Sequence, residues 1–270
     1  MGLYDGCIYY WNCNGDVNDS VGSNDGILEA DGTYTAEGQG ITPQGGGAYS
    51  GKAINLGTTG YILTSETSIL GTDERSISLW FLCSNVNQNA PLAIKVSSSN
   101  GYAQINIGIA NDWNSTAGKH LYFYEYAEGV SPIRGVVTTA TYTDGLWHHV
   151  VAVRATTYSR LYVDGSLIVE NVMGIPNILN DTFWRLGGGW GGQFLVGGFI
   201  DEIGIWDRVL SPTEVADLYL LSSVTYHLSA NESLGLVDLL HRTVKKDLSN
   251  ATRWHYWDEL LHEWKDCEKP

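Results

Sequence analysis

Short apolar and aromatic segments, separated by turn residues, recur through most of this 270-residue chain. Two of them flank Asp164-Gly165, and an Asp-Gly pair between alternating segments is a strong signal for a type I′ β-hairpin. The 32 glycines and 16 tyrosines also favour strands and turns over helices. The pattern predicts an all-β fold, a two-sheet antiparallel β-sandwich of roughly a dozen strands. The clearest predicted strands lie at 76–83, 91–96, 102–109, 121–126, 148–154, 160–163 and 166–169.

The segment that begins at Phe199 alternates like a strand, which would place Asp201 and Ile203 on one face and Glu202 on the other. Whichever face is the core face, a carboxylate then projects among large apolar side chains. A buried carboxylate is costly unless it is paired, hydrogen-bonded or bound to a cation. This strand therefore gives the first chemical indication of a site.

A short helix is predicted directly after this strand. Ser211 is a favourable N-cap, Pro212 suits the first helical position, and Glu214 stands where a capping box requires it. We therefore expect the strand to run into the helix through a sharply defined turn.

The chain is acidic, with 15 basic against 30 acidic residues and a net charge of -15. Phosphate binding needs basic patches, so nucleic acid is not an expected partner. No apolar run approaches the roughly 20 residues of a transmembrane helix, so we expect no membrane insertion. The N-terminal residues also lack the pattern of a signal peptide. The cysteines show no C-x-x-C spacing for zinc, and Cys7 and Cys13 are either bridged or free.

Several motifs occur in a fixed order along the chain. An opening Tyr-Trp strand precedes a loop rich in Asn, Asp and Gly, and the later motifs are Trp147-His148-His149-Val150, Leu161-Tyr162-Val163-Asp164-Gly165, Ile200-Asp201-Glu202-Ile203 and Leu210-Ser211-x-x-Glu214. Together they resemble the signature of the concanavalin A-like lectin, or laminin-G-like, jelly roll. The resemblance implies such a domain over residues 1–222. It is less specific for activity, because one fold hosts many functions.

The resemblance also implies a structural Ca²⁺ ion between the first loop and the Ile-Asp-Glu strand, with Asp19 and Asp201 as side-chain ligands. A cation would neutralise a carboxylate that is otherwise stranded in an apolar strand, and calcium takes oxygen ligands. The alternative is that Asp201 caps backbone amides of a neighbouring loop, and that the Asn and Asp residues only form turns. The sequence leaves both interpretations open.

Aromatic residues in predicted loops indicate carbohydrate binding. Exposed aromatic rings pack on the C–H groups of sugars, while nearby amides and carboxylates bind the hydroxyl groups. The predicted binding residues are Trp113, Trp190, Gln193 and Tyr126. In the alternative interpretation these aromatic side chains only anchor the loops or fill the core.

No catalytic residues are predicted. A glycosidase needs two carboxylates roughly 5 to 9 Å apart, which a strand supplies at positions i and i+2. Within residues 1–222 only Glu29 and Asp31 have that spacing, in a segment rich in turns. His148 and His149 point to opposite faces of a strand and cannot share a metal. We therefore expect a protein that is not an enzyme.

Residues 223–270 are predicted to form a helical docking or oligomerisation tail. Trp254, Trp257, Leu261 and Trp264 follow a helical spacing, and such an apolar stripe should pack on another protein or a second copy. Residues 232–244 also resemble a repeat in tail and appendage proteins of viruses of bacteria and archaea.

The predicted function is that of a lectin-like surface protein of a virion, from a phage or an archaeal virus, made in the host cytoplasm. Its expected partners are cell-surface glycan, other virion proteins bound through the C-terminal helices, and further copies of itself. Two alternatives are a carbohydrate-binding module of an exported, extracellular protein and a purely structural capsid or tail decoration without a ligand.

Overall fold

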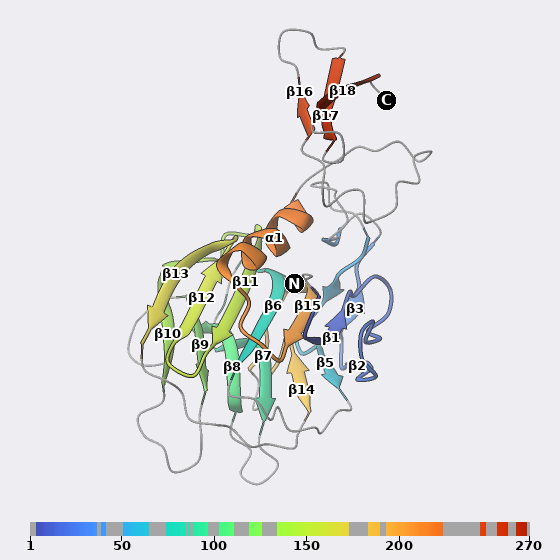
Figure 1. Cartoon of the computed structure of the whole chain (residues 1–270). Helices are drawn as coiled ribbons and strands as arrows, with labels where there is room; N and C mark the ends of the chain where they lie inside the picture. The colour runs from blue at the N-terminus through green and yellow to red at the C-terminus, as the bar shows by residue number, and fades with distance from the viewer. Residues whose placement is uncertain are drawn as a thin grey trace. The chain divides into compact units, whose positions relative to one another are not determined.

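The chain divides into two compact units, Met1–Thr225 and Tyr226–Pro270. Figure 1 shows a computed structural model of the chain. It describes residues 4–36, 39–41, 51–64, 74–84, 86, 89–96, 103–110, 119–125, 134–172, 183–189, 193–223, 244–246, 253–258 and 263–268.

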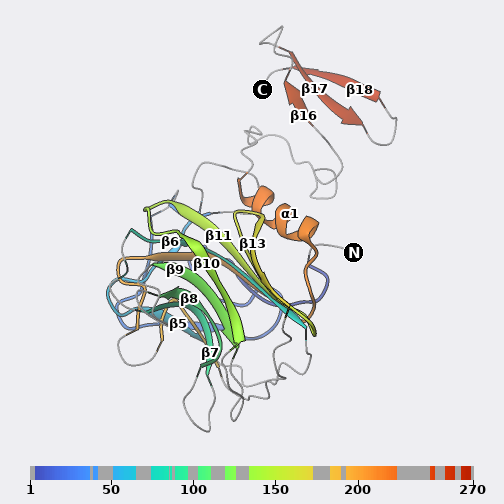
Figure 2. The same ribbon diagram turned by 90° about the vertical axis from the view of Figure 1, so that its left-hand side faces the viewer.

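Two antiparallel sheets form the first unit, which confirms the predicted β-sandwich (Figures 1 and 2). The first sheet has the order β13-β12-β11-β6-β15-β4-β3, with β1 also paired to β15, and the second has the order β10-β9-β8-β7-β14-β5-β2. In chain order the strands are β1 (Cys7–Trp11), β2 (Gly26–Glu29), β3 (Thr33–Tyr34), β4 (Ile54–Asn55), β5 (Tyr61–Thr64), β6 (Arg75–Leu82), β7 (Ala90–Val96), β8 (Ala103–Ala110), β9 (His120–Glu125), β10 (Arg134–Thr141), β11 (Trp147–Arg154), β12 (Ser159–Val163), β13 (Ser166–Asn171), β14 (Trp184–Leu186) and β15 (Phe199–Trp206).

The main core lies between the two sheets and is built from alternate residues of their strands. Because side chains along a strand point to opposite faces, every second residue is available to the core. The core residues include Ile77, Leu79 and Phe81 of β6 from the first sheet, and Ile105, Ile107 and Ile109 of β8 from the second.

The predicted hairpin is present between β12 and β13. Asp164 and Gly165 both adopt positive φ values, 49° and 75°, as a type I′ turn requires. The turn fixes the register of two strands that lie at the edge of the first sheet.

The predicted helix, α1 (Pro212–Ser223), covers the outer face of the first sheet (Figure 2). Val215 and Leu218 of the helix pack with Val151 and Val153 of β11 in a second apolar cluster. The capping box is also confirmed, because the Glu214 N–H donates to Ser211 Oγ and the Ser211 N–H donates to Glu214 Oε2.

Strand β15 contains a bulge that the alternation rule does not predict. The pairing of β15 with β6 shifts register between Asp201 and Gly204, and Glu202 has a φ of 48°. The extra residue returns Ile203 to the core face that Ile200 occupies, so the predicted placement of Asp201 and Ile203 on one face is wrong.

In the second unit the described residues form a three-stranded antiparallel sheet of β16 (Val244–Lys246), β17 (Arg253–Asp258) and β18 (Glu263–Glu268). Trp254 and Trp257 lie in β17, and Trp257 pairs with Trp264 of β18, so the predicted helix with these residues is wrong. Leu261 lies outside the described residues. The physical reason is that tryptophan and tyrosine favour strands, and a short apolar pattern does not distinguish helix from strand.

Among the described residues, no helix has the length and apolar character needed to cross a membrane.

Candidate functional site

The outer face of the second sheet carries the side chains that alternate with the core. Because Ile105 and Ile107 of β8 belong to the core, Asn106 between them points outward. Backbone pairing joins one such residue from each strand into a row across the sheet. This row runs through Gly135, Tyr124, Asn106, Ile94, Arg185, Leu63 and Ile27.

Two stacked tyrosines and an asparagine form a buried polar network on this face. The rings of Tyr122 and Tyr124 lie 5.1 Å apart, Asn106 Nδ2 donates to the Tyr124 hydroxyl at 2.9 Å, and the Tyr122 hydroxyl donates to Asn106 Oδ1 at 3.2 Å. Burial raises the pKa of both tyrosine hydroxyls, so they stay neutral. A Cβ atom added to Gly108 would lie 2.5 Å from the Tyr122 hydroxyl, so only glycine fits there.

Further along the sheet, an arginine and two aromatic rings form a stack that is half-buried rather than buried. The guanidinium carbon of Arg185 lies 4.4 Å from the ring centroid of Tyr61, and the Tyr61 and Phe194 rings stack at 6.3 Å. Arg185 Nη1 donates to the carbonyl of Gly189 at 2.7 Å, which fixes the guanidinium over the ring. We call Tyr61, Arg185, Gln193 and Phe194 the Arg185 cluster.

Gln193 is the predicted carbohydrate-binding residue that lies beside this stack. The backbone carbonyl of Gln193 accepts the Gly189 N–H at 2.6 Å. The half-buried side chain of Gln193 also packs over Gly189, because a Cβ atom added to that glycine would lie 3.2 Å from Gln193 Oε1. Of the other residues predicted to bind carbohydrate, Trp113, Trp190 and Tyr126 lie outside the described residues.

Sequence reasoning missed Tyr61, Arg185 and Phe194. Tyr61 and Arg185 come from strands that are far apart in the chain and adjacent in the sheet, β5 and β14. No local motif marks such a pair, because the register between the strands brings it together. The only sequence signal for any of them was the prediction at Gln193, which directly precedes Phe194.

The predicted metal ligand Asp19 is surrounded by backbone amides. Its Oδ1 accepts the N–H groups of Tyr10 at 2.9 Å, Val21 at 3.1 Å and Gly22 at 3.0 Å, and its Oδ2 accepts the N–H of Asn24 at 3.0 Å. These donors direct their positive ends at the carboxylate and stabilise its charge without a cation. These contacts give Asp19 a structural role in the first loop, and its role as a calcium ligand rests on the resemblance alone.

The second predicted ligand, Asp201, also accepts amide hydrogens. Its Oδ2 accepts the N–H of Ile41 at 2.6 Å and its Oδ1 accepts the N–H of Glu202 at 2.9 Å. These contacts match the alternative in which Asp201 caps a neighbouring loop. Among the described residues, no three His, Cys, Asp or Glu side chains are placed to hold a metal ion. Calcium binding is thus implied by the resemblance alone, and the described residues leave it untested.

Glu202 at the bulge is the other buried carboxyl group on β15. The Tyr10 hydroxyl donates to Glu202 Oε2, whereas Oε1 is buried and has no hydrogen-bond partner among the described residues. Burial raises the pKa of Glu202 to about 8 and outweighs the opposite effect of the Tyr10 hydrogen bond. Burial, with the neighbouring Glu202 charge, also raises the pKa of Asp201.

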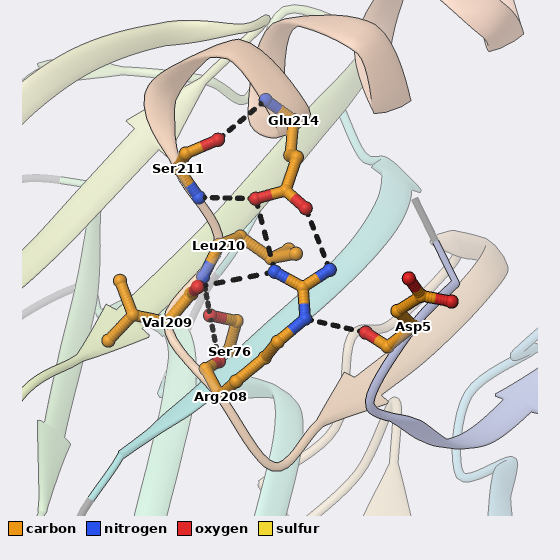
Figure 3. A network of polar contacts seen from close by, with 7 residues as sticks. All are labelled: Asp5, Ser76, Arg208, Val209, Leu210, Ser211 and Glu214. Carbon is orange, nitrogen blue, oxygen red and sulfur yellow. Dashed lines mark hydrogen bonds and ion pairs between the residues drawn. The ribbon is translucent and has the colours of Figure 1, made fainter. Parts of the chain in front are cut away.

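The Leu-Ser-x-x-Glu motif has a structural role (Figure 3). Glu214 forms a two-point ion pair with Arg208, with N–O distances of 2.7 and 3.1 Å, and Arg208 Nε donates to the carbonyl of Asp5 at 2.5 Å. Ser76 Oγ donates to the Arg208 carbonyl and accepts the Leu210 N–H. The motif therefore joins the start of α1 to β6 and to the N-terminal segment.

The other residues weighed for catalysis, metal binding or a disulfide also have structural surroundings. Both carboxylate oxygens of Asp31 accept hydrogens from Thr58 and Thr59. His148 and His149 point to opposite faces, as predicted, since His148 contacts Asp144 and Asp164 whereas His149 contacts Ser78. The cysteines Cys7, Cys13 and Cys83 are free, so Cys7 and Cys13 are not bridged.

The fold and the motifs agree with the comparison to known families. A sequence profile of the concanavalin A-like lectin/glucanases superfamily matches residues 56–216. The chain belongs to this superfamily. No curated protein matches the chain in sequence.

Solved structures share the fold at low sequence identity. Domain 4 of the GH43 extracellular arabinanase AbnA from Geobacillus stearothermophilus, in complex with arabinotriose, is 21% identical, with a TM-score of 0.59 over 79% of this chain and 98% of that chain. The binding domain of botulinum neurotoxin DC in complex with SialylT is 15% identical, with a TM-score of 0.59 over 81% and 52%. Trypanosoma rangeli sialidase is 15% identical, with a TM-score of 0.56 over 81% and 33%. The matched region thus spans about half of the neurotoxin domain and a third of the sialidase.

Proposed function

We propose that this protein binds carbohydrate through the Arg185 cluster. The observation that carries the proposal is the half-buried stack of Arg185, Tyr61 and Phe194 beside the Gln193 amide, on a sheet face that α1 does not cover. The similar structures whose descriptions name arabinotriose and SialylT support this choice of ligand class.

The chemistry of the cluster suits a sugar. A sugar ring presents C–H groups on its faces and hydroxyl groups at its edge, so a site needs an apolar aromatic surface together with polar groups. Phe194 supplies aromatic surface, and Gln193 supplies one amide donor group and one acceptor. Arg185 is held by the Gly189 carbonyl and the Tyr61 ring, so little side-chain entropy is lost when a ligand binds.

Binding without hydrolysis is the activity that we propose. Hydrolysis of a glycosidic bond needs one carboxylic acid and one carboxylate on either side of that bond. The carboxylates of Asp19, Asp31 and Asp201 all accept backbone amide hydrogens, which supports structural roles for them.

The test is a glycan array with the full chain, followed by titration calorimetry with the best ligand. We expect Gln193→Ala to weaken binding roughly 3- to 10-fold, the effect of one lost hydrogen bond. Arg185→Lys should weaken it at least as much, because lysine lacks the planar fork of donors. The control is Val196→Ala, at an exposed neighbouring position outside the cluster. Absence of any bound glycan, or full affinity in both cluster variants, would refute the proposal.

We propose further that the protein belongs to the surface or tail of a virus of bacteria or archaea and that residues 223–270 attach it to another protein or to a second copy. The resemblance of residues 232–244 to viral appendage proteins supports this. Mass spectrometry of co-purifying proteins, with the full chain as bait, tests it. Virion proteins are the expected result, whereas secreted enzymes would favour an exported binding module.

A further inference from the structure

His149 lies beneath the only helix described in the first unit. It stands on β11, on the outer face of the first sheet, and is 2% exposed. Its ring stacks on Trp80 at 5.1 Å and on Tyr219 of α1 at 6.2 Å, and Tyr219 also stacks on Trp80 at 5.7 Å. Tyr219 therefore holds α1 against the imidazole.

The hydrogen bonds of His149 suit a neutral ring and not a charged one. Nε2 lies 2.7 Å from Ser78 Oγ, whereas Nδ1 is buried and has no hydrogen-bond partner among the described residues. A neutral imidazole has one donor nitrogen and one acceptor nitrogen, whereas an imidazolium needs an acceptor at each. Protonation would leave a buried charge with an unsatisfied N–H group, which costs several kcal/mol in such surroundings.

The groups that face His149 do not offset this cost. From β6 it meets Ser78 and Trp80, and from α1 it meets Tyr219, none of which carries a negative charge at neutral pH. The nearest carboxylate is Asp164 of the β12–β13 turn, which accepts the backbone N–H of His149 and is shared with the ring of His148. On β15, Asp201 pairs with Trp80, one strand further away. Burial lowers the pKa of His149 to about 3, against the weaker influence of Asp164.

We infer that α1 is an acid-sensitive latch: proton uptake by His149 in mildly acidic solution releases the helix from the first sheet. α1 is the last described element of the first unit, and the chain continues from it into the second unit. Release would expose the apolar cluster around Val151 and Val153. This inference is independent of the proposed carbohydrate site, which lies on the other sheet.

The expected size of the effect follows from linkage. A histidine exposed by release of the helix regains the ordinary pKa of 6.5. Below that pH it binds a proton, whereas the histidine of the docked state stays neutral. The docked state is therefore fully favoured above pH 6.5 and loses stability as the pH falls below it. Between about pH 7.5 and pH 5 the opening equilibrium should rise roughly 30-fold.

Hydrogen exchange of the full chain, followed by mass spectrometry at about pH 7.5 and pH 5, tests the inference. After correction for intrinsic exchange rates, protection of residues 212–223 should fall roughly 30-fold at the lower pH, while β8 and β9 keep their protection. His149→Phe retains an aromatic ring and cannot take up a proton, so its α1 protection should be equal at both pH values. Where circular dichroism shows that this variant is unfolded, His149→Gln replaces it.

The neighbouring variant His148→Asn is the matched control and should keep the acid response of α1. The inference is overturned if α1 protection does not change with pH, or if it changes equally in His149→Phe. It is also overturned if β8 and β9 lose protection by the same factor, because the event is then global unfolding.

Discussion

The hydroxyl of Tyr10 on β1 donates its hydrogen to the carboxyl group of Glu202 on β15, at the bulge in the pairing of β15 with β6. The contact joins the opening aromatic strand to the Ile-Asp-Glu motif, which are far apart in the sequence. The Glu202 carboxyl group is buried at this contact, and burial raises its pKa to about 8.

Glu202 should make the protein less stable as the pH rises. Its pKa in the folded protein lies above the ordinary value of 4.5, so its contribution is fully present below pH 4.5 and is lost as the pH rises through about 8. We expect Glu202→Gln, a permanent neutral analogue, to remove this loss and to be more stable than the native protein at pH 8. Urea denaturation at a series of pH values measures this. Equal slopes of stability against pH in the two proteins would contradict it.

Replacement of Asp19 by asparagine should destabilise the first loop. Asparagine keeps only one of the two acceptor oxygens and turns an NH₂ group toward amide donors, so we expect a loss of about 2 kcal/mol. Asp16→Asn is a suitable control, since Asp16 is exposed and accepts a single N–H, that of Asn18. Thermal denaturation compares the two variants, and a loss of equal size in both would show that the amide cage of Asp19 contributes nothing particular.

The amide contacts of Asp19 also give an expectation for calcium. Because four backbone N–H groups already surround this carboxylate, we expect calcium to leave the melting temperature of chelator-treated protein unchanged. Calorimetry and thermal denaturation with added Ca²⁺ check this. Heat of binding, together with a raised melting temperature that Asp201→Asn abolishes, would instead establish the ion that the resemblance implies.

His148 should respond to pH in the opposite sense to His149. Its Nδ1 contacts Asp164 Oδ2 at 2.8 Å and its Nε2 contacts Asp144 Oδ1 at 3.2 Å. Burial lowers the pKa of His148, but the contacts with the two carboxylates together outweigh it and raise the pKa above 6.5. The stabilisation is present below pH 6.5 and is lost as the pH rises through the raised value.

We expect His148→Asn to lower stability by up to about 1 kcal/mol at pH 6 and by less at pH 8, since both carboxylates are partly exposed. Urea denaturation at the two pH values provides the measurement. A larger loss at pH 8 than at pH 6 would reverse the assigned sign.

The ion pair at the start of α1 should depend on the shape of the arginine side chain. Arg208→Lys keeps the charge but loses the two-point contact with Glu214 and the bond to the Asp5 carbonyl, so we expect a loss of about 1 kcal/mol. Arg160→Lys is the control, because Arg160 forms an ion pair with Glu170 on the exposed edge of the sheet. Thermal denaturation monitored by circular dichroism ranks the variants, and equal melting temperatures would contradict the expectation.

Much of the fold could be predicted from local patterns. The Asp164-Gly165 turn, the strands on either side of it and the capping box of Ser211 and Glu214 depend on neighbours in the chain, and the structure confirms them. The tail was mispredicted because tryptophan and tyrosine also favour strands, and strand pairing such as that of Trp257 with Trp264 is not local information.

The candidate site was accessible to sequence analysis only in part. Gln193 was predicted because its amide lies near Trp190 in the sequence, but nothing in the sequence connects it with Tyr61 or Arg185. The pairing of β5 with β14 creates that connection.

The sequence by itself determined the fold class, the hairpin and the entry into α1, because turn conformation, strand alternation and helix capping are set by residues a few positions apart. Only the tertiary structure decided that Asp19 is enclosed by amides, that a bulge turns Glu202 toward Tyr10, and that His149 lies under Tyr219. Burial and hydrogen-bond partners determine the chemistry of these groups. Both depend on contacts between strands that are distant in the chain.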